Sequence, residues 1–490
     1  MIAAAFALAA SLASSPVDVQ YRAALDLLYD GSTDTALARL ASLREASPDD
    51  PMGAYLEALA LCWKIEQEPG SRALDAELHR RVDRAIGLAD ARLAKDPSDV
   101  RAKVARGAAH GVRSRLHMFR AEARGAARAA VRMREDLLAA RKADPESKDV
   151  LFGLGLYDYY ADVLPRAAKL LRFLMGMPGG NRERGLASIA AAEEGSLFHR
   201  AEVEWQLYSI YAFYEDDPDR ADAPLLALRR RYPQNPLWAL QLAEHRRDRL
   251  GLYAESAAVA RQILSAAEAG HPNYAGVVAA LARLSLGESL LLDLRLGEAE
   301  EVLRRASDGA PEDPAIATRA HLLLGRVLEL GGRREAAQTH YRVAATSIRG
   351  DIRRSARLAL SSPLSKAEAA GAIRLGEARR LREGGRPGPA LAAYRETLLA
   401  WPRCREAALR IADEDLRQGR TEAALGAARE IEVGNDPAPP WVRAEARLIQ
   451  ADALAGRDRA AAERLYKNVF NHPLGREDLR ERAAEALTRH

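Results

Sequence analysis

The chain has 490 residues, enough for two or three globular domains or for one long solenoid. Apolar residues make up 48% and aromatic residues only 6%, and the many alanines among them favour helices, so we expect an all-α protein. The 73 Lys and Arg against 69 Asp and Glu leave a net charge of +4, too small to indicate nucleic acid as a partner. The two cysteines, Cys62 and Cys404, lie far apart and have no metal-ligand spacing. We expect unpaired buried thiols, with a disulfide as the alternative.

Residues 1–13 are uncharged and mostly apolar, which is typical of a signal-peptide core and too short for a membrane span. Ser11 and Ala13 satisfy the small-residue rule for cleavage before Ser14. The segment therefore predicts a bacterial protein exported to the periplasm or secreted. Since no Lys or Arg precedes the apolar part, the alternative is an alanine-rich first helix of a cytoplasmic protein. No later segment is apolar enough to predict a transmembrane helix.

Residues 17–200 predict irregular helical hairpins. Residues 24–51 form one helical pair in this interpretation, and residues 100–145 form a long hairpin that ends at Pro145, because proline cannot continue a helix. Residues 166–177, RAAKLLRFLMGM, predict a short apolar helix with two cations. We expect this helix to cover the core as a plug, and the alternative is a helix that lies on a membrane surface.

Residues 101–134 carry ten Lys and Arg against one acidic residue, Glu122. Four arginines recur at every fourth position, along one helix face: Arg120, Arg124, Arg128 and Arg132. Because like charges at this spacing repel, the row needs compensation. We expect it from acidic residues on neighbouring helices, and the alternative is an acidic polypeptide or an anionic lipid headgroup. Nucleic acid is not expected, since the segment has few aromatics for base stacking.

From residue 202 onward the chain repeats with a period of about 34 residues. Short breaks, most of them containing glycine, separate paired apolar-periodic stretches, which gives the windows 202–235, 237–270, 283–316, 318–351, 371–404, 405–438 and 442–475. Glycine in the turn permits a positive φ, a small residue lets the two helices touch, and proline stops the second helix. The residues at these three positions are, for glycine, Gly251, Gly297, Gly332, Gly385, Gly419 and Gly456; for alanine, Ala221, Ala337, Ala390, Ala424 and Ala461; and for proline, Pro233, Pro314, Pro402 and Pro473.

On this joint recurrence, residues 202–475 resemble the tetratricopeptide-repeat superfamily. The resemblance implies an α-solenoid of antiparallel helical hairpins wound into a right-handed superhelix, with residues 476–490 as a C-terminal capping helix. Within residues 151–195, the sequences GLGLYDYYADVLP, LLRFLMGMPGG and RERGL resemble a subgroup of exported bacterial tetratricopeptide proteins. They are also similar, more distantly, to the tetratricopeptide-domain 39 family. Neither resemblance implies catalytic residues.

The motifs of metalloproteases, serine hydrolases and phosphate-binding loops are missing from the sequence. His110 and His117 lie two helical turns apart without a third ligand, so we expect neither a metal site nor a cofactor. Asp158 and Asp162 lie one turn apart and could act as acid and base in an α/α-toroid hydrolase. We favour a surface or ion-pair role for them and expect no catalytic residue.

In repeats of this kind, the first helix of each pair lines a concave groove. The positions that would face it have mixed chemistry, which suits a peptide or a protein helix. They are Trp238, Gln241, His245, Arg249, Arg319, Arg326, Arg379, Arg382, Asp413 and Arg417. The leading hypothesis is a non-enzymatic scaffold for protein–protein interaction in the bacterial cell envelope. The alternatives are a peripheral membrane adaptor that uses the arginines of 101–134 and helix 166–177, and the hydrolase.

Overall fold

The computed structural model describes residues 15–67, 70–164, 169, 177–215, 217–308, 313–434 and 439–471, and every regular element in these ranges is a helix. The chain divides into two compact units. Unit 1 runs to Leu207 and includes Arg231–Pro233, and unit 2 holds Tyr208–Arg230 and the chain from Gln234 onward. The predicted signal peptide, the capping helix 476–490 and most of helix 166–177 lie outside the described residues.

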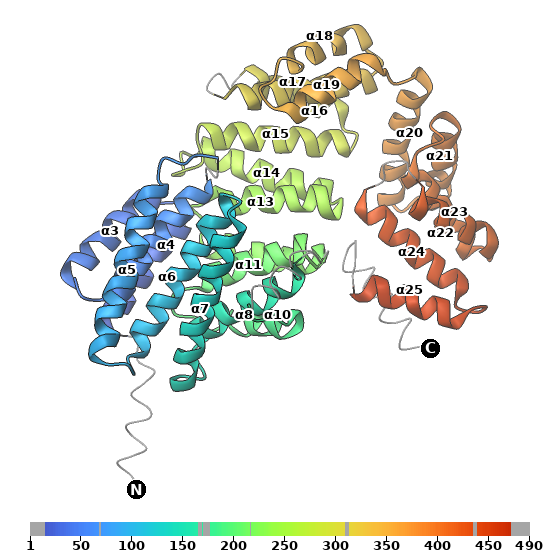
Figure 1. The fold of residues 1–490 in the computed structure, drawn as a ribbon. Helices are drawn as coiled ribbons and strands as arrows, with labels where there is room; N and C mark the ends of the chain where they lie inside the picture. The colour runs from blue at the N-terminus through green and yellow to red at the C-terminus, as the bar shows by residue number, and fades with distance from the viewer. Residues whose placement is uncertain are drawn as a thin grey trace. The chain divides into compact units, whose positions relative to one another are not determined.

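In unit 1, from α2 to α10, each described helix packs against the next described one along the chain, which makes a series of hairpins (Figure 1). The predicted pair at 24–51 corresponds to α2 and α3, and the predicted hairpin at 100–145 corresponds to α6 and α7, so both expectations are confirmed. The helices of this unit are α2 (Pro16–Tyr29), α3 (Thr33–Ala46), α4 (Pro51–Gln67), α5 (Asp75–Lys95), α6 (Val100–Phe119), α7 (Ala123–Ala143), α8 (Lys148–Val163), α10 (Arg182–Ala191) and the first half of α11 (Arg200–Phe213).

Helix α4 forms the centre of unit 1, because it is buried on all sides from Pro51 to Trp63. Its sequence, PMGAYLEALALCW, is apolar around the whole helix, as expected of a helix without a solvent-facing side. It packs against α3, α5 and α6. Cys62 lies in this core as a free thiol, as expected, and burial raises the pKa of this thiol to about 12.

In unit 2, every predicted window contains one helical pair. The prediction of an α-solenoid of tetratricopeptide-like hairpins is therefore confirmed for the described residues. One helix was not predicted: α19 lies between the windows 318–351 and 371–404. The helices are α12 (Pro218–Arg231), α13 (Pro236–His245) with the π-helix η2 (Arg246–Leu250), α14 (Tyr253–Glu268), α15 (Val277–Leu292), α16 (Leu296–Asp308), α17 (Pro314–Leu330), α18 (Arg334–Ala344), α19 (Gly350–Ser361), α20 (Lys366–Glu383), α21 (Pro387–Ala400), α22 (Arg405–Arg417), α23 (Thr421–Val433), α24 (Pro440–Leu454) and α25 (Arg459–Asn471).

The turns within the pairs confirm most of the glycine assignments. Four of the predicted glycines have positive φ: Gly251, Gly332, Gly385 and Gly419. Gly297 was wrongly assigned, because it lies inside α16 and Leu294 takes the positive φ of that turn, at 59°. A backbone hydrogen bond from Arg295 N to Leu290 O, at 2.9 Å, closes this turn. The turn of the next pair is closed by the equivalent bond, from Arg333 N to Leu328 O at 2.8 Å. The turn geometry is therefore kept although leucine replaces glycine. Gly456 is not among the glycines with positive φ.

A second group of glycines sets how closely the two helices of a pair approach. Gly325 of α17 faces the ring of Tyr341 of α18, so that a side chain at this position would overlap the ring. Gly287 of α15 faces Leu303 of α16 in the same way. Tyr341 is fully buried in this contact. The small residue in the first helix thus lets a large residue of the second helix fill the space between them.

Replacing Gly325 by Ala should therefore destabilise the protein, although alanine is the better helix former. We expect the unfolding free energy to fall by about 1–3 kcal/mol through overpacking against Tyr341. Gly426 in α23 is the matched control, because a Cβ there would meet no atom within 4 Å, so Gly426→Ala should raise stability by about 0.5–1 kcal/mol. Urea unfolding of both variants measures this, and a midpoint that moves upward in both would refute the close contact.

Candidate functional site

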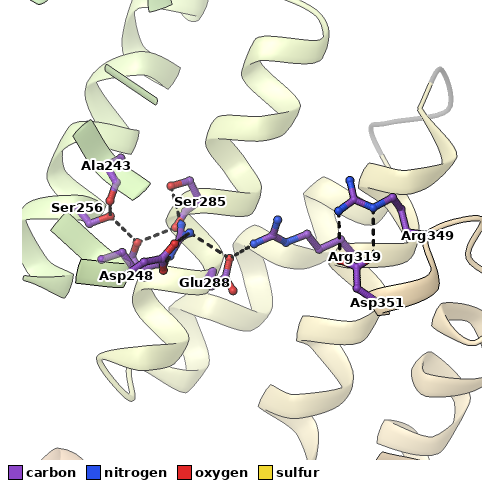
Figure 2. A network of polar contacts seen from close by, with 10 residues as sticks. Ala243, Asp248, Ser256, Ser285, Glu288, Arg319, Arg349 and Asp351 are labelled. Atoms are coloured by element: carbon purple, nitrogen blue, oxygen red, sulfur yellow. Dashed lines mark hydrogen bonds and ion pairs between the residues drawn. The ribbon is translucent and has the colours of Figure 1, made fainter. Parts of the chain in front are cut away.

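Charged side chains from three successive first helices of unit 2 meet in one row (Figure 2). Arg247 of η2 donates to Asp248 at 2.7 Å and lies 3.6 Å from Glu288 of α15. Arg319 of α17 donates to the same Glu288 carboxylate at 2.7 Å. We call Arg247, Asp248, Glu288 and Arg319 the charged row. Its members connect the hairpins that begin with α13, α15 and α17.

Buried hydroxyl groups hold the inner side of this row. Ser285 accepts a hydrogen bond from Arg247 at 3.1 Å. Ser289 donates to the Ser285 carbonyl at 2.7 Å, and its hydroxyl lies 2.8 Å from that of Ser256. Ser256 donates in turn to the carbonyl of Ala243 at 2.7 Å. This chain fixes Arg247 in the interior while its carboxylate partners reach the surface.

The π-helix explains why Arg247 points inward. It ends at Gly251, whose φ is 67°, with Leu252 N bonded to Arg246 O at 2.9 Å. Single π-helical turns within α-helices occur frequently at functional sites. Burial alone would lower the pKa of Arg247, but its hydrogen bond to Asp248 and the charge of Glu288 raise it above the ordinary value. Arg247 therefore stays charged, and the row keeps both signs of charge.

The row is partly open to solvent. The side chain of Asp248 is 55% exposed and that of Arg319 is 44% exposed, whereas Arg247 is 3% exposed. Arg326 lies two helical turns after Arg319 on the same helix and is also exposed. The candidates Arg319 and Arg326 are thus accessible on one face of α17. Arg247 and Glu288 were not among the predicted residues, since a fixed offset within each window does not include the π-helical shift.

Two predicted groove residues lie in the core instead. Trp238 is 1% exposed and His245 is 2% exposed. His245 Nε2 lies 2.6 Å from the carbonyl oxygen of Pro218, and burial lowers the pKa of this imidazole. This placement corrects the expectation that both side chains line an open groove, because both are buried, and His245 lies against Pro218 of α12 and the ring of Tyr208 of α11. Gln241 and Arg249 are half-buried, and Arg249 donates to the Ala212 carbonyl.

Arg379 of α20 forms a joint between distant parts of unit 2. It donates to Glu406 of α22 at 2.8 Å and to the carbonyl of Leu292 of α15 at 2.7 Å, and it lies 5.3 Å from the centre of the Tyr253 ring. Its side chain is only 14% exposed. The prediction that Arg379 is a groove residue was therefore wrong. The position of a residue within a repeat predicts the helix face on which it lies, but it does not predict whether another helix covers that face. We call Arg379, Glu406, Leu292 and Tyr253 the Arg379 joint.

Of the remaining groove candidates, Arg382 and Arg417 are exposed, whereas the Asp413 side chain is only 14% exposed. Arg382 is exposed on α20. Asp413 and Arg417 of α22 form an ion pair with each other, one helical turn apart, and the Arg417 side chain is 63% exposed.

The basic segment of unit 1 divides into paired and unpaired arginines. All four arginines of α6 pair with carboxylates outside this helix, as expected, and so does Arg120. The pairs are Arg101 with Asp18 and Asp50, Arg106 with Asp90 and Asp136, Arg113 with Asp83, Arg115 with Glu66 and Glu202, and Arg120 with Asp75. Arg120 lies in the turn between α6 and α7, which corrects the prediction that it shares one helix face with Arg124, Arg128 and Arg132. Arg124, Arg128 and Arg132 are exposed on α7, and within the described parts of the chain no carboxylate forms an ion pair with them.

A hollow of about 560 Å³ lies in unit 1 between α2, residues 195–201 and Arg231–Tyr232. Its walls carry both signs of charge: Arg22, Arg200 and Arg231, with Asp26 and Asp30. Arg231 donates to Glu204 at 2.8 Å, and Tyr232 donates to Asp26 at 3.1 Å. Burial raises the pKa of Glu204 to about 7. Because these charges satisfy one another, the hollow favours no single charge of ligand.

Of the side chains considered for chemistry, His117, Asp158 and Asp162 have structural partners. His110 is buried, and burial lowers its pKa to about 4, whereas His117 lies 2.7 Å from Glu122. Asp158 accepts from Arg184 at 2.7 Å, and Asp162 accepts from the backbone of Arg182 at 2.9 Å. Among the described residues, no group of three or more His, Cys, Asp and Glu side chains could hold a metal ion. None of the described helices is long and apolar enough to cross a membrane.

No protein-family model matches the chain, and no curated protein matches it. Among solved structures, yeast Tom70 is 12% identical with a TM-score of 0.30, over 89% of this chain and 88% of that chain. The tetratricopeptide domain of P58(IPK) is 13% identical with a TM-score of 0.22, over 97% and 99%. The APC/C hetero-tetramer Cut9-Hcn1 contains a chain that is 12% identical with a TM-score of 0.23, over 95% of each. At these TM-scores the helices do not superpose, so the likenesses carry no inference about a partner.

Replacing Arg379 by Met tests whether the Arg379 joint holds unit 2 together. The change leaves the buried Glu406 carboxylate without its counter-charge, so the unfolding free energy should fall by about 3–5 kcal/mol. Arg417→Met, which removes an exposed pair within one helix, should cost about 0.5 kcal/mol or less. Equal shifts of the urea midpoint in the two variants would contradict the joint.

The same pair predicts a pH dependence. Burial alone would raise the pKa of Glu406, but Arg379 lowers it below its ordinary value. The pair therefore stabilises the fold above the ordinary glutamate pKa of about 4.3, and this contribution is lost as the pH falls through the lower pKa of the folded state. The difference in stability between wild type and Arg379→Met should accordingly be smaller at pH 3.5 than at pH 7.

Proposed function

We propose that this protein is a non-enzymatic scaffold that binds another polypeptide along its helical hairpins. Stacked hairpins present long continuous surfaces, and such surfaces bind extended segments or helices of a partner. The observation that carries the proposal is the charged row. It brings Asp248, Glu288 and Arg319 together from three hairpins and leaves its two ends, Asp248 and Arg319, open to solvent.

The chemistry of the row indicates the kind of partner. A carboxylate and a guanidinium are both exposed, and Arg326 extends the positive end along α17. A polypeptide segment with both signs of charge can pair with both ends, and complementary charges then set its orientation. A partner with one sign of charge would meet repulsion at one end.

The two other functions have less support. In the hydrolase hypothesis, Asp158 and Asp162 must be available as acid and base, yet Arg184 and the backbone of Arg182 occupy them. The membrane-adaptor hypothesis needs helix 166–177, most of which lies outside the described residues, and the arginines of 101–134, most of which are paired. Protein binding is therefore the function that we propose.

Charge reversal in the row tests this function. We expect Arg319→Glu/Arg326→Glu to lower the recovery of specific partners about 10-fold or more in affinity purification from the native envelope fraction, since each reversal replaces attraction by repulsion. The control Arg342→Glu/Arg354→Glu changes the same charge at exposed positions of α18 and α19 and should recover the partners as wild type does. The same loss in both variants would show that the charged row is not the binding site. A wild-type chain that recovers no specific partners would contradict the proposed scaffold function.

We also propose that the protein works in the bacterial cell envelope after export, on the basis of residues 1–13. N-terminal sequencing of the natural protein after cell fractionation should find a chain that begins at Ser14 in the periplasm or the medium. A chain with an intact Met1 in the cytosolic fraction would contradict the proposed export, and it would not affect the proposal of protein binding.

A further inference from the structure

Helix α7 of unit 1 has two opposite faces. One face packs against α6 and α8 and buries Ala126, Ala129, Met133, Leu137 and Ala140. The other face exposes Arg124, Arg128 and Arg132, which we call the arginine row. These residues follow one another at every fourth position, so the row advances by about 6 Å per arginine. The one acidic side chain that α7 exposes is Glu135.

The arginine row contrasts with the helix that precedes it. Every arginine of α6 has at least one carboxylate partner, and Arg101, Arg106 and Arg115 have two each. The folded chain therefore supplies acidic side chains to α6, and none of the described ones pairs with the arginine row. Like charges one turn apart repel, so the row makes α7 less stable than neutral residues would. No carboxylate among the described residues offsets this repulsion, so the row is available to a partner outside the chain.

We propose that the arginine row binds an acidic helical segment of the partner polypeptide, with a carboxylate at every fourth residue. This inference rests on the proposed function and names the chemistry of a partner segment. Glutamates at every fourth position of a helix also repeat at about 6 Å, so their spacing matches that of the three arginines. Each guanidinium can hold a carboxylate with two parallel hydrogen bonds, which favours arginine over lysine for this task.

A lipid surface fits the row less well than a polypeptide does. A helix that lies on a membrane inserts its apolar face into the lipid, and the apolar face of α7 is buried inside the hairpin. Binding to anionic lipid by charge alone usually takes about four to eight Lys and Arg residues together, whereas the arginine row has three. The row therefore favours an acidic polypeptide.

Three exposed ion pairs give only part of the affinity of such a complex. An exposed pair typically changes an equilibrium constant by about 1.5- to 5-fold, so the row should contribute about 10-fold and a faster association at low salt. The row would therefore act together with other contacts to the same partner. Its contribution should weaken as salt shortens the range of the charges.

The test measures binding of a labelled synthetic helical peptide with glutamate at every fourth position to the full-length protein, by fluorescence anisotropy at about 10 mM ionic strength, where charges act over roughly 30 Å. We expect Arg124→Glu/Arg128→Glu/Arg132→Glu to weaken binding about 10-fold or more. The control Arg39→Glu/Arg84→Glu/Lys95→Glu makes the same change of net charge at exposed positions of α3 and α5 and should bind within about 2-fold of wild type. Circular dichroism checks that both variants are folded.

Three other results would contradict the proposal. An equal loss in both triple variants would overturn the proposal, because binding would then follow net charge alone. Loss of flotation with phosphatidylserine vesicles in the α7 variant, with peptide binding unchanged, would overturn it in favour of a membrane. If the α7 variant binds the peptide like wild type while Arg319→Glu/Arg326→Glu still loses its natural partners, the arginine row is wrong and the scaffold function stands.

Discussion

A guanidinium that is taken out of water must meet a carboxylate, and this constraint organises both units of the protein. Arg115 shows it most fully. Its side chain is 18% exposed and lies over the ring of Trp63, between the carboxylates of Glu66 and Glu202. Burial alone would lower the pKa of Arg115, but these two carboxylates raise it above its ordinary value. These ion pairs connect α4, α6 and α11.

The same constraint divides the charged side chains into those that pair within the fold and those that remain available to a partner. In unit 2, Arg379 with Glu406 and Arg410 with Glu445 are nearly buried pairs that fix helices against one another. The charges left at the surface are then informative, because the fold has not used them. Arg124, Arg128 and Arg132 in unit 1, and the exposed ends of the charged row in unit 2, remain for a partner. The proposed scaffold thus presents to a partner the charged side chains that do not form ion pairs within the fold.

Sequence reasoning identified the hairpins because their signals are local. Glycine, alanine and proline act within one turn or one helix contact, so the windows from 202 onward each contain a helical pair. Gly325 and Tyr341 lie within the window 318–351 and pack against each other across its helical pair. The exceptions have local causes too. Leu294 adopts a positive φ in place of a glycine, and η2 shifts Arg247 inward by a π-helical turn. Neither leaves a repeated signal in the sequence.

The sequence by itself determined that this chain is a series of helical hairpins with a basic segment near its start, since periodicity and turn residues act over a few residues. Only the tertiary structure decided which arginines are available. Arg120 and Arg124 belong to one periodic row in the sequence, yet Asp75 pairs with the first and leaves the second in solvent. Trp238 is likewise buried, and Arg379 is largely covered by contacts with α15 and α22, although their offsets within the repeat predict groove residues. Burial and ion pairing depend on which helices meet, and a local pattern does not contain that information.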